Sequence, residues 1–146
     1  MIFALILSPV TSAFFAERST ESFTERMKRT GVLPRLAATD LGAVGIAARA
    51  SGVNIDARRD LPYAAYPKLR LAVASETAGD VEARFLVRFV EALTSFRLCR
   101  EVLEDLPGGP LASPLPPLPP NTTGLGLTES PRGENVHWLR TDGEGR

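Results

Sequence analysis

The most regular pattern of apolar and polar positions lies in residues 80–109, DVEARFLVRFVEALTSFRLCREVLEDLPGG. Its apolar residues recur at intervals of three and four, which is the spacing of positions on one face of an α-helix. Asp80 is a residue type that caps helix N-termini, and the Pro-Gly-Gly at 107–109 ends helices. The pattern therefore predicts a helix from Asp80 to about Asp105, the longest and most central of the chain.

Two stripes follow this predicted helix. We expect the apolar stripe to face the core: Phe85, Phe89, Ala92, Phe96, Cys99 and Leu103. The polar stripe has spacings of four, three and four, so its members share one row: Arg84, Arg88, Glu91 and Ser95. Arg88 is placed to pair with Glu91. Because apolar residues flank this row on both sides, it is either a solvated face or a buried ionic row that points toward residues 49–58 or the turn near Arg132.

Shorter patterns predict the elements before this helix. STESFTERMKR, at residues 19–29, has Ser or Thr as a cap with Glu soon after it and predicts a short helix. Pro34 fits the first turn of a second helix, which ends near Leu41. The small residues that follow allow close approach of backbones, so we expect this segment to lie deep in a larger body. KLRLAV, at residues 68–73, alternates as a half-buried strand does.

The C-terminal part of the chain combines a proline-rich run with a strand pattern. Residues 107–120, PGGPLASPLPPLPP, favour extended polyproline II, as a spacer or as a P-x-x-P docking segment. NVHWLR alternates as a strand, and Asp142-Gly143 is a hairpin signal. We therefore expect a returning strand after Arg146, and hence an internal fragment of a longer protein.

These patterns together predict a mainly α fold with a small β-hairpin element. We expect residues 1–106 to form the helical part of the body, 107–128 a Pro/Gly-rich linker, and 129–146 the start of a hairpin that carries the Pro-Arg-Gly-Glu turn. The apolar N-terminus, MIFALILSPVTSAFF, is too short to span a bilayer and lacks preceding basic residues. We expect a core-packed helix or a start that is not the natural one there, with a signal peptide as the alternative.

Charge and cysteine content narrow the function. The formal net charge is zero, which argues against a nucleic-acid partner bound through bulk charge. The chain has one Cys, so it forms no internal disulfide and no cysteine-rich metal site, and a reducing compartment is the simplest interpretation. Because Cys99 belongs to the apolar stripe, we expect a packed and inert thiol.

Four stretches carry a family resemblance, in this order: RMKRTGVL, DLGAVGIAARASGVNIDARRDLPYAAY, GDVEARFLVRFVEALTSFRL and ESPRGENVHW. They resemble the large-subunit family shared by nickel–iron hydrogenases and the 49-kDa, or D, subunit of respiratory complex I. Arg132 and His137 are most similar to the energy-converting hydrogenase-like branch, since the complex I subunit usually carries Lys where Arg132 stands. The resemblance implies an internal fragment of a hydrogenase-large-subunit-like fold.

The resemblance implies a catalytic role for Arg132. In hydrogenases the matching guanidinium lies over the nickel–iron centre and stabilises charge near the metal, as a fixed and always-charged fork can. The alternative is that Arg132 only ties a turn to the helical body. The family's metal is held by two Cys-x-x-Cys pairs, which Cys99 cannot replace. We therefore expect no cofactor on this chain, although the family uses a nickel–iron centre or quinone, with iron–sulfur clusters on partner subunits.

The resemblance also assigns a set of residues to the scaffold around the family's cavity. They are Arg49, Ser51, Gly52, Asp56, Arg58, Arg84, Arg88, Glu91, Gly133, Glu134 and His137. Tyr63 and Tyr66 do not match the family's quinone-contacting residues, and neither does His137.

The implied activity is oxidoreductase electron transfer to quinone or protons within an NADH-quinone oxidoreductase or hydrogenase-like respiratory complex, with quinone and NAD binding. We expect the fragment alone to be inactive. The implied partners are a small iron–sulfur subunit and membrane subunits, at the cytoplasmic face of the inner membrane, without a membrane span in this chain. The alternative is a non-catalytic interaction or assembly module that uses the proline-rich segment.

Overall fold

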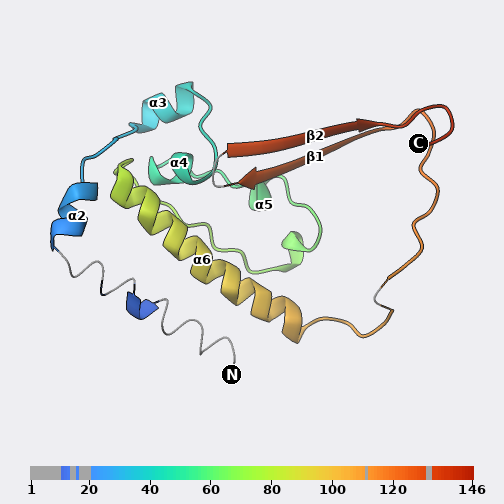
Figure 1. The fold of residues 1–146 in the computed structure, drawn as a ribbon, viewed down its shortest axis with the longest axis horizontal. Helices are drawn as coiled ribbons and strands as arrows, with labels where there is room; N and C mark the ends of the chain where they lie inside the picture. Colours follow the sequence, from blue (N-terminus) through green and yellow to red (C-terminus); the bar gives the residue numbers. More distant parts are fainter. Residues whose placement is uncertain (1–10, 14–15, 17–20, 111, 131–132) are drawn as a thin grey trace.

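The fold is mainly helical with one β-hairpin, as the sequence predicts (Figure 1). A computed structural model describes residues 11–13, 16, 21–110, 112–130 and 133–146. Two expectations, the N-terminal helix in residues 1–10 and the position of Arg132, lie outside the described residues. The elements are α2 (Glu21–Met27), α3 (Arg35–Asp40), α4 (Gly45–Ala50), α5 (Ala57–Asp60), the 3-10 helix η1 (Tyr66–Lys68), α6 (Val81–Glu104), β1 (Thr123–Ser130) and β2 (Gly133–Arg140).

Helix α6 begins and ends where the sequence predicts. Asp80 is its N-cap, and one carboxylate oxygen accepts a hydrogen bond of 2.9 Å from the backbone N–H of Ala83. The other oxygen accepts from the backbone N–H of Arg29, also at 2.9 Å. Asp80 thus joins the start of α6 to the segment that follows α2, and it satisfies an N–H group that the helix cannot pair internally.

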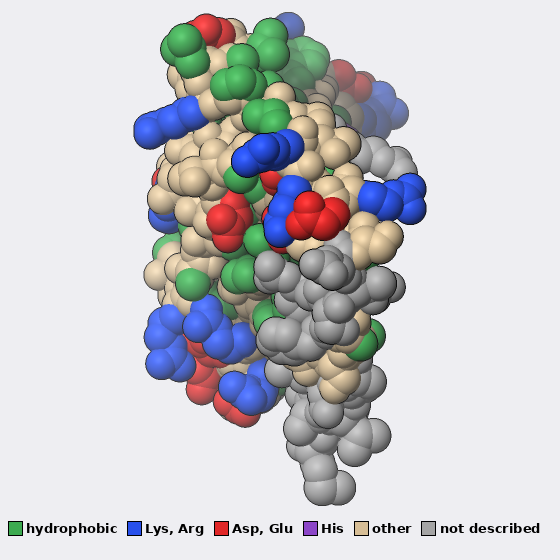
Figure 2. All heavy atoms as spheres, turned by 90° about the vertical axis from the view of Figure 1, so that its left-hand side faces the viewer, with side chains coloured by type: hydrophobic (Ala, Val, Ile, Leu, Met, Phe, Trp, Pro, Cys, Tyr) green, Lys and Arg blue, Asp and Glu red, His purple; other side chains and the backbone are tan. Residues whose placement is uncertain are grey.

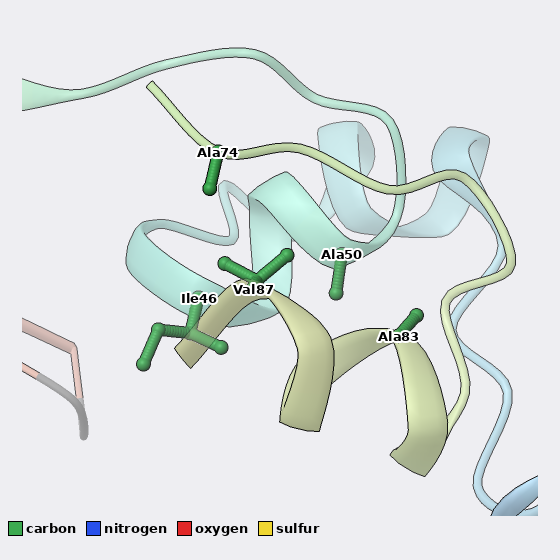
Figure 3. Close-up of a cluster of buried hydrophobic side chains, with 5 residues drawn as sticks. All are labelled: Ile46, Ala50, Ala74, Ala83 and Val87. Atoms are coloured by element: carbon green, nitrogen blue, oxygen red, sulfur yellow. The ribbon is translucent and has the colours of Figure 1, made fainter. Parts of the chain in front are cut away.

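A small apolar core lies between α4 and α6. Figure 3 shows the cluster, in which Ile46 and Ala50 of α4 meet Ala83 and Val87 of α6, with Ala74 from the extended segment above them. Three of these five side chains are alanines, so the helix backbones approach closely. The run of small residues after Gly42 therefore serves close packing, as expected from the sequence.

A close backbone crossing requires glycine at position 79. The backbone N–H of Leu33 donates to the carbonyl oxygen of Gly79 at 2.9 Å. A Cβ atom at position 79 would lie 2.2 Å from the Leu33 carbonyl oxygen, and the residue has φ of +66°. Only glycine combines that conformation with that contact, so the segment before α3 packs directly on the turn that starts α6.

The buried face of α6 differs from the predicted one. The buried residues are Ala83, Val87, Thr94 and Leu98, whereas Ala92, Cys99 and Leu103 of the predicted stripe are exposed. The phenylalanines of that stripe are half-buried, and the ring of Phe85 contacts that of Phe23 with centroids 5.9 Å apart. The prediction of the core face and of a packed Cys99 thiol is therefore wrong. Because α6 is apolar on several faces, its packing partners decide which one is buried.

The strand predicted for residues 68–73 is also wrong. These residues include the end of η1 and an extended segment without ladder pairing. Their backbone groups bind elsewhere: the carbonyl oxygen of Arg70 accepts from the Arg97 side chain at 2.7 Å. Farther along, the N–H of Glu76 donates to the carbonyl oxygen of Arg49 at 2.9 Å. Alternation indicated a half-buried extended segment here, but no neighbouring strand pairs with it among the described residues.

The hairpin pairs β1 with β2, and this corrects the predicted hairpin. The ladder runs from Thr123 opposite Arg140 to Ser130 opposite Gly133. The partner of the NVHWLR strand therefore precedes it, and the strand expected after Arg146 is not its partner. Asp142 instead forms a local turn, in which its carboxylate accepts from the backbone N–H groups of Glu144 and Arg146. Glycines alternate with apolar residues in β1 and lower its strand propensity, which hid it in the sequence.

The linker connects the end of α6 with the far end of the hairpin (Figure 1). Every described residue of 107–120 is exposed, and β1 begins at Thr123, inside the segment 107–128 expected as linker. The Thr141 hydroxyl donates to the carbonyl oxygen of Pro119 at 2.6 Å. The linker thus meets the residues just after β2, at the end of the hairpin remote from the helices.

The visible surface mixes both signs of charge. Figure 2 shows, on the face seen from the left of Figure 1, acidic and basic side chains beside one another rather than a patch of one sign. Of the helices in the described ranges, none has the length and apolar character needed to cross a bilayer.

Candidate functional site

A buried arginine in α4 is the centre of the candidate site. Arg49 is 3% exposed, and both its Nε and Nη2 atoms lie 2.7 Å from Oε1 of Glu91 on α6. Its Nη1 atom donates to Glu129 of β1 at 2.7 Å and to the carbonyl oxygen of Ile55 at 2.8 Å. The planar guanidinium suits this use because its donors point in fixed, divergent directions. One side chain therefore joins a helix, a loop and the hairpin.

A second ion pair extends this centre. Asp56 is the N-cap of α5 and is 1% exposed, with one oxygen 3.6 Å from Nη1 of Arg49. Arg58 grips both Asp56 oxygens, with Nε at 2.9 Å and Nη2 at 2.6 Å. Burial alone would raise the pKa of Asp56, but the hydrogen bonds and charge of Arg58, aided by Arg49, lower it overall. The same hydrogen bonds raise the pKa of Arg58.

Glu129 connects the hairpin to this centre, and the sequence analysis did not assign it a role. Its Oε2 atom accepts from Arg49, and its Oε1 atom accepts from the backbone N–H of Ala57 at 2.8 Å. The side chain is 14% exposed. Its signal was its place as the acid that opens the matched stretch ESPRGENVHW, at the end of an alternating strand.

A cavity of about 190 Å³ adjoins these charges. The rings of Tyr63 and Tyr66 meet edge to face with centroids 5.0 Å apart. Burial, with the nearby Tyr66, raises the pKa of Tyr63. An apolar cavity of about 410 Å³ along α6 shares Arg58 and Tyr66 with the first. The first cavity is lined by Ile46, Arg49, Arg58, Tyr63, Tyr66, Glu91, Glu129 and Ser130.

We call Arg49, Asp56, Arg58, Glu91 and Glu129 the Arg49 cluster. It holds two guanidinium groups and three carboxylates at short distances. Buried charges of this kind persist when they are paired and hydrogen-bonded. The cluster therefore supplies fixed charges on one wall of the cavity, and it holds four separate segments of the chain in register.

The polar row predicted on α6 divides in the structure. Glu91 belongs to the Arg49 cluster and points toward residues 49–58, as the buried interpretation expects. Arg84 instead donates to the carbonyl oxygens of Gly79 and Gly31, at 2.8 and 3.0 Å. Arg88 is exposed, and Glu91 pairs with Arg49 rather than with it. The predicted pair between Arg88 and Glu91 is therefore wrong, because a deeper partner takes the carboxylate.

Two more scaffold residues shape the end of α4. The Ser51 hydroxyl donates to the carbonyl oxygen of Ala47 at 2.9 Å, and Ser51 is 1% exposed. Gly52 has φ of +79°, which turns the chain after the helix. Both residues lie beside Arg49 in sequence and support the helix that carries it, without entering the cluster.

The three described residues expected beyond the turn lie outside the Arg49 cluster. Gly133 has φ of +132° and pairs with Ser130. Glu134 stands opposite Glu129 in the ladder, yet it is exposed. His137 is exposed opposite Gly126, four residues along the strand from Gly133, which is about 13 Å at strand spacing.

The thiol content does not fit a nickel–iron centre. Such a centre takes four thiolates, and this sequence has one Cys, which is exposed on α6. Within the described part of the chain, no three side chains of His, Cys, Asp or Glu gather as metal ligands would. No step through a metal held by these residues follows from the structure.

Comparison with known proteins adds a family. Residues 16–123 match the family described as respiratory-chain NADH dehydrogenase, 49 Kd subunit. The chain is 41% identical over 130 residues to the carbon monoxide-induced hydrogenase of Rhodospirillum rubrum, covering 88% of this chain and 36% of that protein. It is 37% identical over 130 residues to the second D-type subunit of NADH-quinone oxidoreductase from Anaeromyxobacter dehalogenans (strain 2CP-C), covering 84% and 34%.

A third relative and a solved structure agree with these matches. Formate hydrogenlyase subunit 5 of Escherichia coli (strain K12) is 37% identical over 123 residues, covering 84% of this chain and 22% of that protein. A chain of the membrane-bound sulfane sulfur reductase, an archaeal respiratory membrane complex, shares the fold with a TM-score of 0.87 and 23% identity. That match covers 99% of this chain and 41% of the other. The chain spans about a third of the length of the first two relatives.

Proposed function

The chain belongs to the family of the 49-kDa subunit of respiratory-chain NADH dehydrogenase, and we propose that it forms part of an electron-transfer subunit in a quinone-reducing or hydrogenase-like complex. The named relatives, a hydrogenase, an NADH-quinone oxidoreductase subunit and a formate hydrogenlyase subunit, support this proposal. The electron acceptor is quinone or protons. We expect the chain of 146 residues alone to be inactive.

The observation that carries the proposal is the Arg49 cluster beside the cavity. Charges that are fixed before reaction stabilise charge that develops during it, and they do so without reorganisation. Arg49, 3% exposed, is held from three sides by hydrogen bonds of 2.7–2.8 Å. We propose that this wall, together with Arg132 of the matched motif, sets the electrostatic environment of the electron-transfer cavity.

The proposed partners are a small iron–sulfur subunit and membrane subunits of the same complex. The proposed location is peripheral, at the cytoplasmic face of the inner membrane. The likeness to a chain of an archaeal membrane-bound respiratory complex is one of fold, and the relatives' names supply the rest of the support. The iron–sulfur clusters would supply the electrons, and this chain's residues would bound the cavity and hold its charges in place.

Purification of the intact protein with its native partners tests the proposal. A tag on this chain should retain an iron–sulfur subunit and membrane proteins, identified by mass spectrometry. With reduced methyl viologen as donor, the preparation should reduce a quinone analogue or evolve hydrogen. Purification without such partners, together with the absence of both activities, would contradict the proposal.

An arginine variant tests the proposed role of Arg132 within that preparation. Arg132→Met removes the charge and Arg132→Lys keeps it without the planar fork. We expect turnover to fall about a hundredfold in the first, by comparison with the loss of one fixed electrostatic group in other enzymes. Exposed Arg140 on β2 offers the matched control Arg140→Met. Equal turnover in Arg132→Met and wild type would leave Arg132 a structural residue.

A docking role for the proline-rich segment is the second candidate. Every described residue of 107–120 is exposed, and Leu115 is 93% exposed. Such a segment could bind an aromatic groove of a partner. A pull-down that compares the intact protein with a variant lacking residues 107–120 separates the candidates, because identical partner sets leave only the spacer role.

A further inference from the structure

We infer that Glu129 is the positioning residue that seats the hairpin against the cavity. The inference rests on the proposed function, because it assigns to Glu129 the placement of one wall of the proposed electron-transfer cavity. It does not make Glu129 a group that touches the reacting molecules. Its role is exerted through Arg49 and through the backbone of β1.

The two oxygens of Glu129 have different partners on different elements. Oε2 accepts from Nη1 of Arg49 on α4 at 2.7 Å. Oε1 accepts from the backbone N–H of Ala57, the first residue of α5, at 2.8 Å. That N–H is one that a helix start leaves unpaired. A single carboxylate in a single orientation therefore fixes both the distance and the rotation of the hairpin end relative to the two helices.

The backbone beside Glu129 sits closely on α4. A Cβ atom at Gly45 would lie 3.4 Å from the carbonyl oxygen of Ser130, and Gly45 has φ of +66°. Ser130 in turn donates its hydroxyl to the carbonyl oxygen of Gly133 at 3.0 Å, which ties the ends of β1 and β2 together. The start of α4 thus forms a seat for the hairpin end, and Glu129 holds it there.

The hairpin needs such an attachment. An isolated two-stranded hairpin is marginally stable in water. The ladder leaves most of the hairpin exposed, and Figure 1 shows it leading away from the helices toward the C-terminus. Ser130 and Glu129 line the cavity, so a shift of the hairpin end changes the shape of the cavity wall.

The ladder also offers a matched control. Glu134 lies directly opposite Glu129 and has the same side chain, but it is exposed. If carboxylates on the hairpin mattered only through general charge, substitutions at both positions would have similar effects. If the attachment matters, only Glu129 is sensitive.

The test uses the intact protein in its native complex, with three variants. Glu129→Ala removes both attachments, Glu129→Gln keeps one acceptor oxygen, and Glu134→Ala is the control. Hydrogen exchange is measured on peptides from β1, β2 and α6, and kcat and KM are measured with reduced methyl viologen as donor.

We expect exchange in the hairpin to rise about tenfold or more in Glu129→Ala, because two hydrogen bonds of a charged group are lost. Exchange in α6 should stay unchanged, which shows that the body is folded. Turnover, as kcat, should fall at least about fivefold with KM for the donor unchanged, since the wall moves while the donor's docking surface does not. Glu129→Gln should lie between wild type and Glu129→Ala, and Glu134→Ala should match wild type.

Unchanged hairpin exchange in Glu129→Ala would overturn the inference, as would an equal rise in Glu134→Ala. Faster exchange with unaltered kcat would overturn the positioning role. If wild type itself transfers no electrons, the proposed function fails, and the exchange measurement alone decides whether Glu129 holds the hairpin. If Glu129→Ala does not assemble, the same comparison between Glu129→Gln and Glu134→Ala decides the inference.

Discussion

The helical body and the hairpin differ in how they are held. In the body, α4 and α6 share an apolar cluster and the Arg49 cluster, and the buried carboxylate of Asp56 is paired on both oxygens. The hairpin has a complete ladder, but large apolar side chains on it face solvent: Leu125 at 70%, Val136 at 52%, Trp138 at 61% and Leu139 at 73% exposed. The body is stabilised by burial, and the hairpin chiefly by its own hydrogen bonds and its attachment through Glu129.

The difference shows where single substitutions should matter. One face of the hairpin is apolar, since Leu125 pairs with Trp138 and Leu127 pairs with Val136. These contacts lie within the hairpin and bury little from water, so each contributes little to stability. The Arg49 cluster is the opposite case, because loss of one partner leaves another charge buried and unpaired. Sensitivity should therefore follow the ionic cluster rather than apolar content.

The largest loss is expected for Arg49→Met. The variant leaves Asp56, Glu91 and Glu129 with one partner fewer, and loss of one partner of a buried ionic pair costs about 3–5 kcal/mol. Chemical denaturation of the intact protein measures the change in the free energy of unfolding. Arg88→Met, at an exposed position of α6, is the control and should change it by about 0.5 kcal/mol or less. Equal losses in the two variants would remove the distinction between cluster and surface.

Glu91→Ala should cost less than Arg49→Met, about 3 kcal/mol. Arg49 loses the contacts of its Nε and Nη2 atoms, but it keeps Glu129 and the carbonyl oxygen of Ile55. The same denaturation experiment measures it. The control is Glu104→Ala, whose carboxylate is 68% exposed in a surface pair with Arg100 and should contribute about 0.5 kcal/mol or less. A loss below about 1 kcal/mol for Glu91→Ala would place Glu91 in the exposed-pair range.

Asp80→Asn should show a smaller, pH-dependent loss. The hydrogen bond from the backbone N–H of Ala83, followed by that from Arg29, lowers the pKa of Asp80. A carboxylate with a lowered folded pKa stabilises the protein fully above its unfolded pKa of about 3.9 and progressively less as the pH falls through the folded value. We expect a difference from wild type of about 1 kcal/mol at pH 7 that shrinks below about pH 4.

Denaturation of wild type and Asp80→Asn at several pH values measures that difference. Asp40→Asn, at the exposed end of α3, is the control for removal of a carboxylate. A difference at Asp80 that is the same at pH 3 and pH 7 would contradict the role of its ionised form.

Trp138→Ser should have the smallest effect on stability. The indole is 61% exposed on β2, so its removal uncovers little apolar surface. The expected change in the free energy of unfolding is about 0.5 kcal/mol or less. Val87→Ala, at a position 1% exposed in the core of the body, is the reference for the other region and should cost about 1–3 kcal/mol. A larger loss for Trp138→Ser than for Val87→Ala would invert the comparison.

Local signals in the sequence predicted the boundaries of elements well. Asp80 and the Pro-Gly-Gly after α6 act within one helical turn, so their effect could be derived from neighbouring residues alone. The start of α3 at Pro34 is another case. The face of α6 could not be derived in that way, because the helix is apolar on several sides and α4 decides which side is buried.

The candidate site was predicted only in part for the same reason. The pair of Asp56 and Arg58 is two residues apart and forms within one turn. The partners Arg49 and Glu91 are 42 residues apart, and Arg49 and Glu129 are 80 apart, so only the folded chain shows which charge meets which. The family resemblance assigned Arg49 and Glu91 to the scaffold without pairing them, and it left Glu129 unassigned.

The most direct test of the account is a double-mutant cycle between Arg49 and Glu129 in the intact protein. The free energy of unfolding is measured for wild type, Arg49→Met, Glu129→Ala and the double variant. If the two side chains join the hairpin to the body, the coupling energy should be at least about 1.5 kcal/mol, within the range for contacting residues. A coupling energy below about 0.5 kcal/mol, as for distant and independent sites, would contradict it.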